Sequence, residues 1–76
     1  MVEELKEIFS EILDIPETEV REQLSPKTLA KWNSMAHMKL IMAMEEAFSV
    51  TFTVDEVRST QSFANAYDLL TNKGVT

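Results

Sequence analysis

No residue between positions 34 and 48 breaks a helix, and this run constrains the fold more than any other feature. Placed at about 100° per residue, its core-forming side chains fall on one stripe. The stripe contains Leu40, Ile41, Met44, Ala47 and Phe48, with Ala36 at its edge. Asn33 and Ser34, at its start, are residue types favoured at the N-cap. The pattern predicts a helix over residues 34–48 with one face against a core.

The opposite side of this helix also carries apolar side chains. Met35, Met38 and Met42 fall there, among Lys39, Glu45 and Glu46. Exposed apolar patches mark partner surfaces, and methionine suits surfaces that meet several partners. The alternative is that the preceding loop covers the methionines, with Trp32 or Leu29 on top. His37 falls with the core stripe, which predicts a buried, hydrogen-bonded histidine.

Residues 2–14 repeat apolar side chains at intervals of three and four, which predicts a first helix. Pro16 forces Ile15 out of helical geometry and ends it. Residues 15–33 form a long connection whose apolar residues recur, so we expect it to lie on the bundle. Those residues are Val20, Leu24, Leu29 and Trp32. Ser25-Pro26 favours a short turn of helix within it.

Two shorter helices are predicted after residue 48. Residues 49–52 have β-prone character but no partner strand, so we interpret them as a connection. A capping-box pattern from Thr53 to Glu56 predicts a short helix over residues 54–58. Ser62 caps a last helix over residues 63–72, which ends at Lys73-Gly74. Its inward residues are Phe63, Ala66, Tyr67 and Leu70. The sum is an all-α, small four-helix bundle with a long first loop and a short third helix.

Composition excludes several classes of function. The 76 residues suit one domain, and the absence of cysteine excludes a disulfide, a thiolate metal site and a cysteine nucleophile. The net charge of −6 argues against nucleic acid, and no segment predicts a membrane span or signal peptide, so we expect a cytoplasmic protein. Ser34 has no neighbouring residues arranged like those of a catalytic triad. The glutamates of the first helix form a solvated face rather than a metal site.

The order of these features along the chain is much more specific than Ser34 alone. After the long loop come Asn33-Ser34-Met35, an apolar helix ending in Met42-Ala43-Met44-Glu45-Glu46-Ala47-Phe48, Phe52, Asp55-Glu56-Val57 and a helix from Ser62. Over essentially its whole length the chain resembles an acyl carrier protein. That family opens its second helix with Asp-Ser-Leu and carries a block like (Leu/Met)-Glu-Glu-x-Phe. Residues 1–76 would then be a single carrier domain, a discrete monomeric carrier rather than a module cut from a megasynthase.

The resemblance implies a function for Ser34. A phosphopantetheinyl transferase would attach 4′-phosphopantetheine from coenzyme A there, making a phosphoprotein whose thiol holds acyl groups as thioesters. The chain would be non-catalytic and would serve acyl-loading and acyl-transfer enzymes of fatty acid or polyketide biosynthesis. The implied partner-facing residues are Met35, Met38, Met42, Glu45 and Glu46. The implied acyl-pocket residues are Leu40, Ile41, Met44, Val57 and Phe63.

The chain departs from the family pattern beside the serine. Asn33 replaces the usual aspartate and Met35 the leucine, while Ala36 and Lys39 stand where many members carry acids. A specialised carrier with more apolar partners fits these changes better than a housekeeping one. Two alternatives remain open. One is an aminoacyl or peptidyl carrier, and the other is a helical protein-interaction domain without a prosthetic group.

Overall fold

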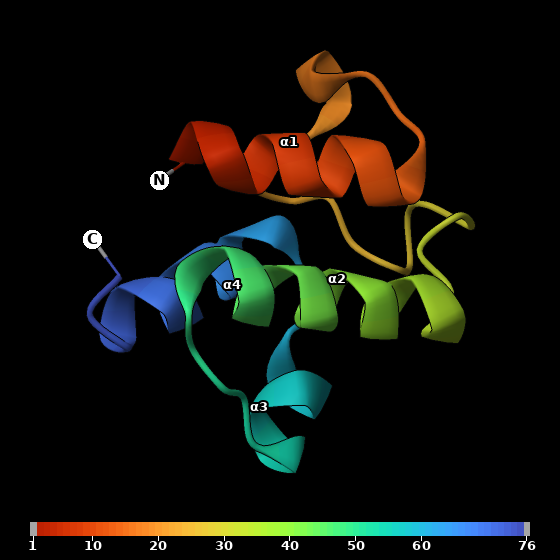
Figure 1. The fold of residues 1–76 in the computed structure, drawn as a ribbon. Helices are drawn as coiled ribbons and strands as arrows, with labels where there is room; N and C mark the ends of the chain where they lie inside the picture. The colour runs from red at the N-terminus through yellow and green to blue at the C-terminus, as the bar shows by residue number, and fades with distance from the viewer. Residues whose placement is uncertain (1, 76) are drawn as a thin grey trace.

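Residues 2–75 fold into four α-helices and one short 3-10 helix (Figure 1). A computed structural model describes residues 2–75, and these contain no β-strand. The helices are α1 (Val2–Leu13), η1 (Glu17–Glu19), α2 (Ser34–Phe48), α3 (Val54–Ser59) and α4 (Phe63–Asn72). The predicted all-α bundle is confirmed, and each α-helix ends within one residue of its predicted bounds. No helix of residues 2–75 is long and apolar enough to cross a membrane.

The connection from α1 to α2 begins with two tight turns. Asp14 has a positive φ of 55° and lets the chain leave α1, while Ile15 returns to the core and is buried. Pro16 then precedes η1, which the sequence analysis missed. A 3-10 helix of three polar residues leaves no apolar repeat in the sequence, so periodicity could not reveal it.

The rest of the long connection lies on the bundle, as predicted. Val20 and Trp32 are buried, and Leu24 and Leu29 are partly buried against the core. Backbone bonds from Thr28 N and Leu29 N to Ser25 O form the short turn expected there. At the start of α4, Phe63 N donates to Leu24 O (3.0 Å) and Ala64 N to Glu22 O (3.1 Å). The connection therefore satisfies N–H groups that a helix start leaves unpaired.

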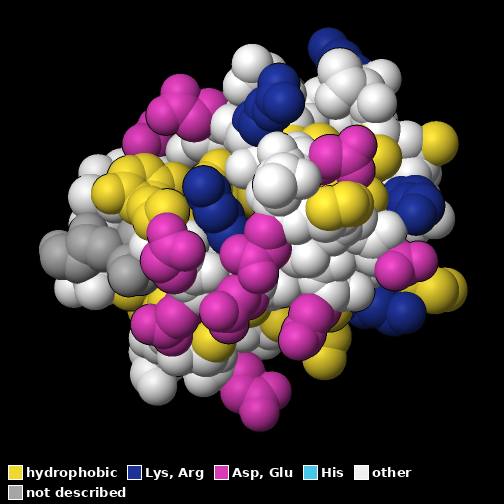
Figure 2. All heavy atoms as spheres, turned by 90° about the horizontal axis from the view of Figure 1, so that it is seen from above, with side chains coloured by type: hydrophobic (Ala, Val, Ile, Leu, Met, Phe, Trp, Pro, Cys, Tyr) yellow, Lys and Arg dark blue, Asp and Glu magenta, His cyan; other side chains and the backbone are white. Residues whose placement is uncertain are grey.

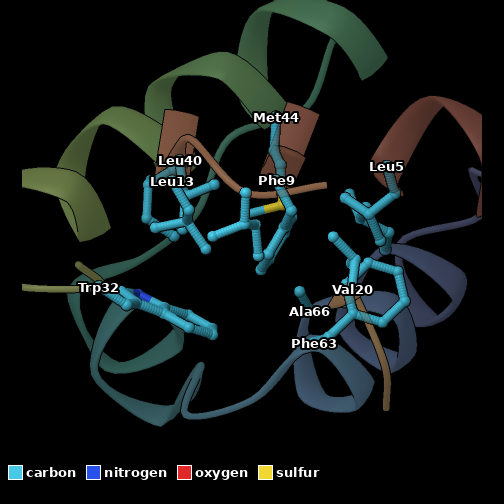
Figure 3. Packing of buried hydrophobic residues seen from close by; sticks show 12 residues of the cluster. Leu5, Phe9, Leu13, Val20, Trp32, Leu40, Met44, Phe63 and Ala66 are labelled. Atoms are coloured by element: carbon cyan, nitrogen blue, oxygen red, sulfur yellow. The ribbon is translucent and has the colours of Figure 1, made fainter. Parts of the chain in front are cut away.

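Phe9 of α1 lies at the centre of the core (Figure 3). Its ring lies nearly perpendicular to the rings of Trp32 and Phe63. The ring centroids are 5.3 Å apart for Phe9 and Trp32 and 5.0 Å apart for Phe9 and Phe63. Such T-shaped pairs are favoured by the ring quadrupole. The other buried apolar residues are Leu5, Leu13, Ile15, Val20, Leu40, Ile41, Met44, Ala66 and Leu70. The predicted place of Ala47 in this stripe is wrong: Ala47 is exposed, because its methyl group at the stripe's edge is too short to reach the core.

The segment after α2 is held both by polar contacts and by apolar side chains, since Val50, Phe52 and Val57 are partly buried against the core. Ser49 adopts the left-handed conformation that ends α2, and the Glu45 carboxylate accepts from Phe52 N at 2.9 Å. The capping box of Thr53 and Glu56 forms as predicted. No residue of α3 is buried. Instead, Lys73 beyond α4 pairs with Glu56 at 2.8 Å, and its ammonium lies 5.4 Å from the centre of the Phe52 ring.

Candidate functional site

Asn33 caps the N-terminus of α2. Its Oδ1 accepts from Ala36 N at 2.9 Å, and its backbone carbonyl accepts from His37 N at 2.8 Å. Of the two residues that the sequence offers as caps, Asn33 is the N-cap, and Ser34 is the first residue of the helix. The Ser34 side chain is exposed, and its hydroxyl makes no hydrogen bond with any residue from 2 to 75.

The electrostatic setting of Ser34 favours an anion. Within the part of the chain that is described, Ser34 N and Met35 N have no acceptor, and the first turn of α2 carries no acidic residue. A helix N-terminus with free N–H groups carries a partial positive charge. Arg58 of α3 lines the same groove as Ser34, and no carboxylate of residues 2–75 forms a salt bridge with it. The start of α2 therefore offers free N–H donors, and the groove beside it is lined by a guanidinium group.

A groove of about 550 Å³ runs beside Ser34, between the start of α2, the end of the long connection and α3. Its lining residues are Pro26, Trp32, Asn33, Ser34, His37, Met38, Val57, Arg58, Thr60 and Gln61. Apolar side chains make up one part of the wall and Arg58 and Gln61 another. An arm leaving Ser34 would find both apolar contact and polar groups within this groove.

His37 links three segments at this groove. The Trp32 indole Nε1–H donates to His37 Nδ1 at 3.0 Å, and His37 Nε2 bonds the Val57 carbonyl at 2.8 Å. The indole and imidazole also stack, with centroids 6.0 Å apart and planes at 23°. The expected hydrogen-bonded histidine is present, but it is half-buried rather than buried. Sequence reasoning did not assign Trp32 or Arg58 to the site, because their place depends on how the connection and α3 fold back.

The methionine face, defined as Met35, Met38 and Met42, is open. These side chains are 70%, 48% and 63% exposed, respectively. The alternative in which Trp32 or Leu29 covers them is wrong, because the Trp32 indole instead points into the core and is 2% exposed (Figure 3). Of the two glutamates assigned to this surface, Glu46 is exposed and Glu45 is half-buried on Phe52 N. A role of these residues in partner binding stays a prediction.

The five predicted acyl-pocket residues lie close to the same core but differ in access. Leu40, Ile41, Met44 and Phe63 are buried in it, whereas Val57 is partly buried against it. Only Val57 of the five also lines the groove beside Ser34. The groove and the buried cluster therefore meet at α3. Whether an acyl chain shelters there stays a prediction.

Acidic side chains dominate the outside of α1, where Glu3, Glu4, Glu7 and Glu11 are all exposed. Figure 2 views the molecule from the α1 side and shows acidic groups spread over this face. Among residues 2–75, no three acidic or histidine side chains are grouped so as to hold a metal ion. The side chains of these four glutamates face solvent.

Together, the fold and this site define a small helical bundle with an exposed serine at the start of its second α-helix. No protein-family model matches the chain. Over 71 residues the chain is 30% identical to the acyl carrier protein of Acidothermus cellulolyticus (strain ATCC 43068 / DSM 8971 / 11B), an alignment that covers 93% of this chain and 84% of that protein. The chain belongs to the acyl carrier protein family.

Proposed function

We propose that this protein is a non-catalytic carrier of acyl groups in the cytoplasm. It holds them as thioesters on a 4′-phosphopantetheine arm attached through a phosphodiester to Ser34. A phosphopantetheinyl transferase loads the arm from coenzyme A, and acyl-loading and acyl-transfer enzymes of a fatty acid, polyketide or specialised pathway then use the protein. The bound arm supplies the thiol that a chain without cysteine lacks.

One observation carries this proposal. The Ser34 hydroxyl is exposed and has no hydrogen-bond partner among residues 2–75, and Ser34 is the first residue of α2 rather than its cap. Asn33 performs the capping instead. The fold therefore has no evident structural use for this hydroxyl, and it leaves the oxygen free to be modified. The free N–H groups of Ser34 and Met35 suit the phosphodiester that results.

Other residues of the chain act on the arm and on its partners. Arg58 offers charge to the phosphodiester, while Trp32 and Val57 provide apolar wall beside it. The methionine face, with Glu46 at its far end, forms the surface that partner enzymes contact. The buried cluster of Leu40, Ile41, Met44 and Phe63, reached past Val57, shelters the acyl chain from water.

Intact mass spectrometry after incubation with coenzyme A, magnesium and a broad-specificity transferase tests the proposal. The wild-type protein should gain the mass of one phosphopantetheine, and Ser34→Ala should gain none. Ser34→Ala should also retain wild-type stability within about 0.5 kcal/mol, because an exposed side chain without partners is lost.

Ser62→Ala is the matched control, since Ser62 also stands at a helix start but accepts from Asn65 N at 3.0 Å. It should load fully yet lose about 0.5–2 kcal/mol of stability. No mass gain in the wild type would favour an interaction domain without a prosthetic group. A gain that persists in Ser34→Ala would place the attachment on another residue.

A further inference from the structure

The hydrogen-bond roles of the two His37 ring nitrogens follow from their partners. An indole Nε1–H can only donate, so His37 Nδ1 must accept and carries no proton. The remaining proton sits on Nε2, which then donates to the Val57 carbonyl at 2.8 Å. The two hydrogen bonds therefore favour the Nε2–H tautomer of His37 and join its ring to the long connection and to α3.

The hydrogen bond between the Trp32 and His37 side chains closes a short loop, residues 32–37, that contains Ser34 and that we call the bracket. Trp32 lies two positions before the serine and His37 three positions after it, and their side chains are joined at 3.0 Å. Within the bracket, Asn33 Oδ1 accepts from Ala36 N and Asn33 O accepts from His37 N. The indole is anchored in turn by its contact with Phe9. The backbone that carries the Ser34 hydroxyl is thus fixed from both sides.

From this geometry we propose that His37 is a positioning residue for the modification of Ser34. Its bond to Trp32 fixes the direction of the serine hydroxyl, and its bond to Val57 fixes the opposite wall of the groove. The site is then presented to the transferase in one conformation, which lowers the ordering cost of binding. The effect on loading rests on the proposed function, whereas the bracket itself is a property of the unloaded chain.

Two substitutions at position 37 separate hydrogen bonding from bulk. A glutamine side chain has one acceptor and one donor, so His37→Gln can accept from Trp32 and donate to Val57. His37→Leu fills similar space with neither group. Spectroscopy of the unloaded protein comes first. The imidazole nitrogens of the wild type should show the Nε2–H tautomer, and the indole N–H proton should be slow to exchange. That slow exchange should survive in His37→Gln and be lost in His37→Leu.

Loading kinetics supply the second measurement. His37→Leu should raise the transferase KM for the carrier by roughly two- to tenfold, the range of one hydrogen bond, with kcat nearly unchanged. His37→Gln should recover most of this loss. Lys73→Met is the matched control, because it removes the Glu56 pair that fastens α3 but leaves the bracket intact. It should leave KM within twofold of the wild type.

Each outcome decides the question. A wild-type imidazole with its proton on Nδ1, or an indole N–H that exchanges as fast in wild type as in His37→Leu, would overturn the bracket. A His37→Leu protein that loses the slow exchange but loads with wild-type KM would overturn the positioning role. An equal rise of KM in Lys73→Met would assign the effect to a looser α3. Failure of the wild type to load would refute the proposed function instead, and the spectroscopic result would stand independently.

Discussion

The two faces of α2 differ so strongly in burial that one pair of substitutions can separate core from surface. Leu40 is 1% exposed and Met42 is 63% exposed, although they lie two positions apart on one helix. Truncating a buried leucine to alanine costs about 2–5 kcal/mol, because transfer free energy is lost and a cavity remains. Full burial of a methionine is worth about 1.5–3 kcal/mol. With only about a third of Met42 buried, its truncation should cost at most about 1 kcal/mol.

Thermal melts followed by circular dichroism convert these values into temperatures. In a domain of this size, 1 kcal/mol shifts Tm by about 4–8 °C. Leu40→Ala should therefore lower Tm by at least about 8 °C, and Met42→Ala by at most about 8 °C. If Met42→Ala melts as early as Leu40→Ala, the methionine face is part of the core and the partner surface is misplaced.

Binding to a cognate acyl-transfer enzyme completes this test. A central apolar anchor of an interface is worth about 2 kcal/mol or more, so Met42→Glu should weaken binding by about thirtyfold or more. Arg21→Gln, at an exposed position of the long connection, changes the net charge by the same amount and is the control, which should bind nearly as the wild type does. A Met42→Glu protein that is fully folded and binds the enzyme like wild type would refute the assignment of this face.

Two further predictions concern caps and ion pairs. Asn33→Ala should lower the free energy of unfolding by about 0.5–2 kcal/mol, while Asn33→Asp should keep or raise it and change loading rates unequally among transferases. Equal rates across several transferases would show that the neutral residue has no recognition role. The hydrogen bond from Lys73, followed by that from the Thr53 backbone, lowers the pKa of Glu56 from its ordinary value of 4.5. A lowered carboxyl pKa stabilises the folded state above that ordinary value, and the contribution is lost as pH falls through the lowered pKa. Urea unfolding in this acid range should show a shallower loss of stability in Lys73→Met than in wild type, and an unchanged slope would contradict the pair's role.

Helix positions were predictable because they depend on local pattern. The apolar repeat of α1, the Thr53 capping box and the Ser62 cap each specify an element without knowledge of the rest of the fold. The methionine face was predictable for the same reason, since a wheel shows which residues lie opposite Leu40. Short polar elements such as η1 carry no such pattern.

Contacts between distant segments were not predictable from the pattern. The wheel placed His37 on the inner side of α2, but its partners Trp32 and Val57 follow from the path of the connection and of α3. Glu45 looked like a surface charge, yet the chain turns so that its carboxylate receives Phe52 N. The choice between Asn33 and Ser34 as cap likewise depended on backbone geometry, because both residue types cap well.

The bonds between the start of α4 and the long connection have a consequence for how the molecule is made. The carbonyls of Glu22 and Leu24 receive N–H groups from Phe63 and Ala64, near the other end of the chain. During synthesis the connection is exposed to solvent long before those residues leave the ribosome. It therefore cannot make these hydrogen bonds until the start of α4 has emerged, and we expect the bundle to fold as a unit only after α4 has been synthesised.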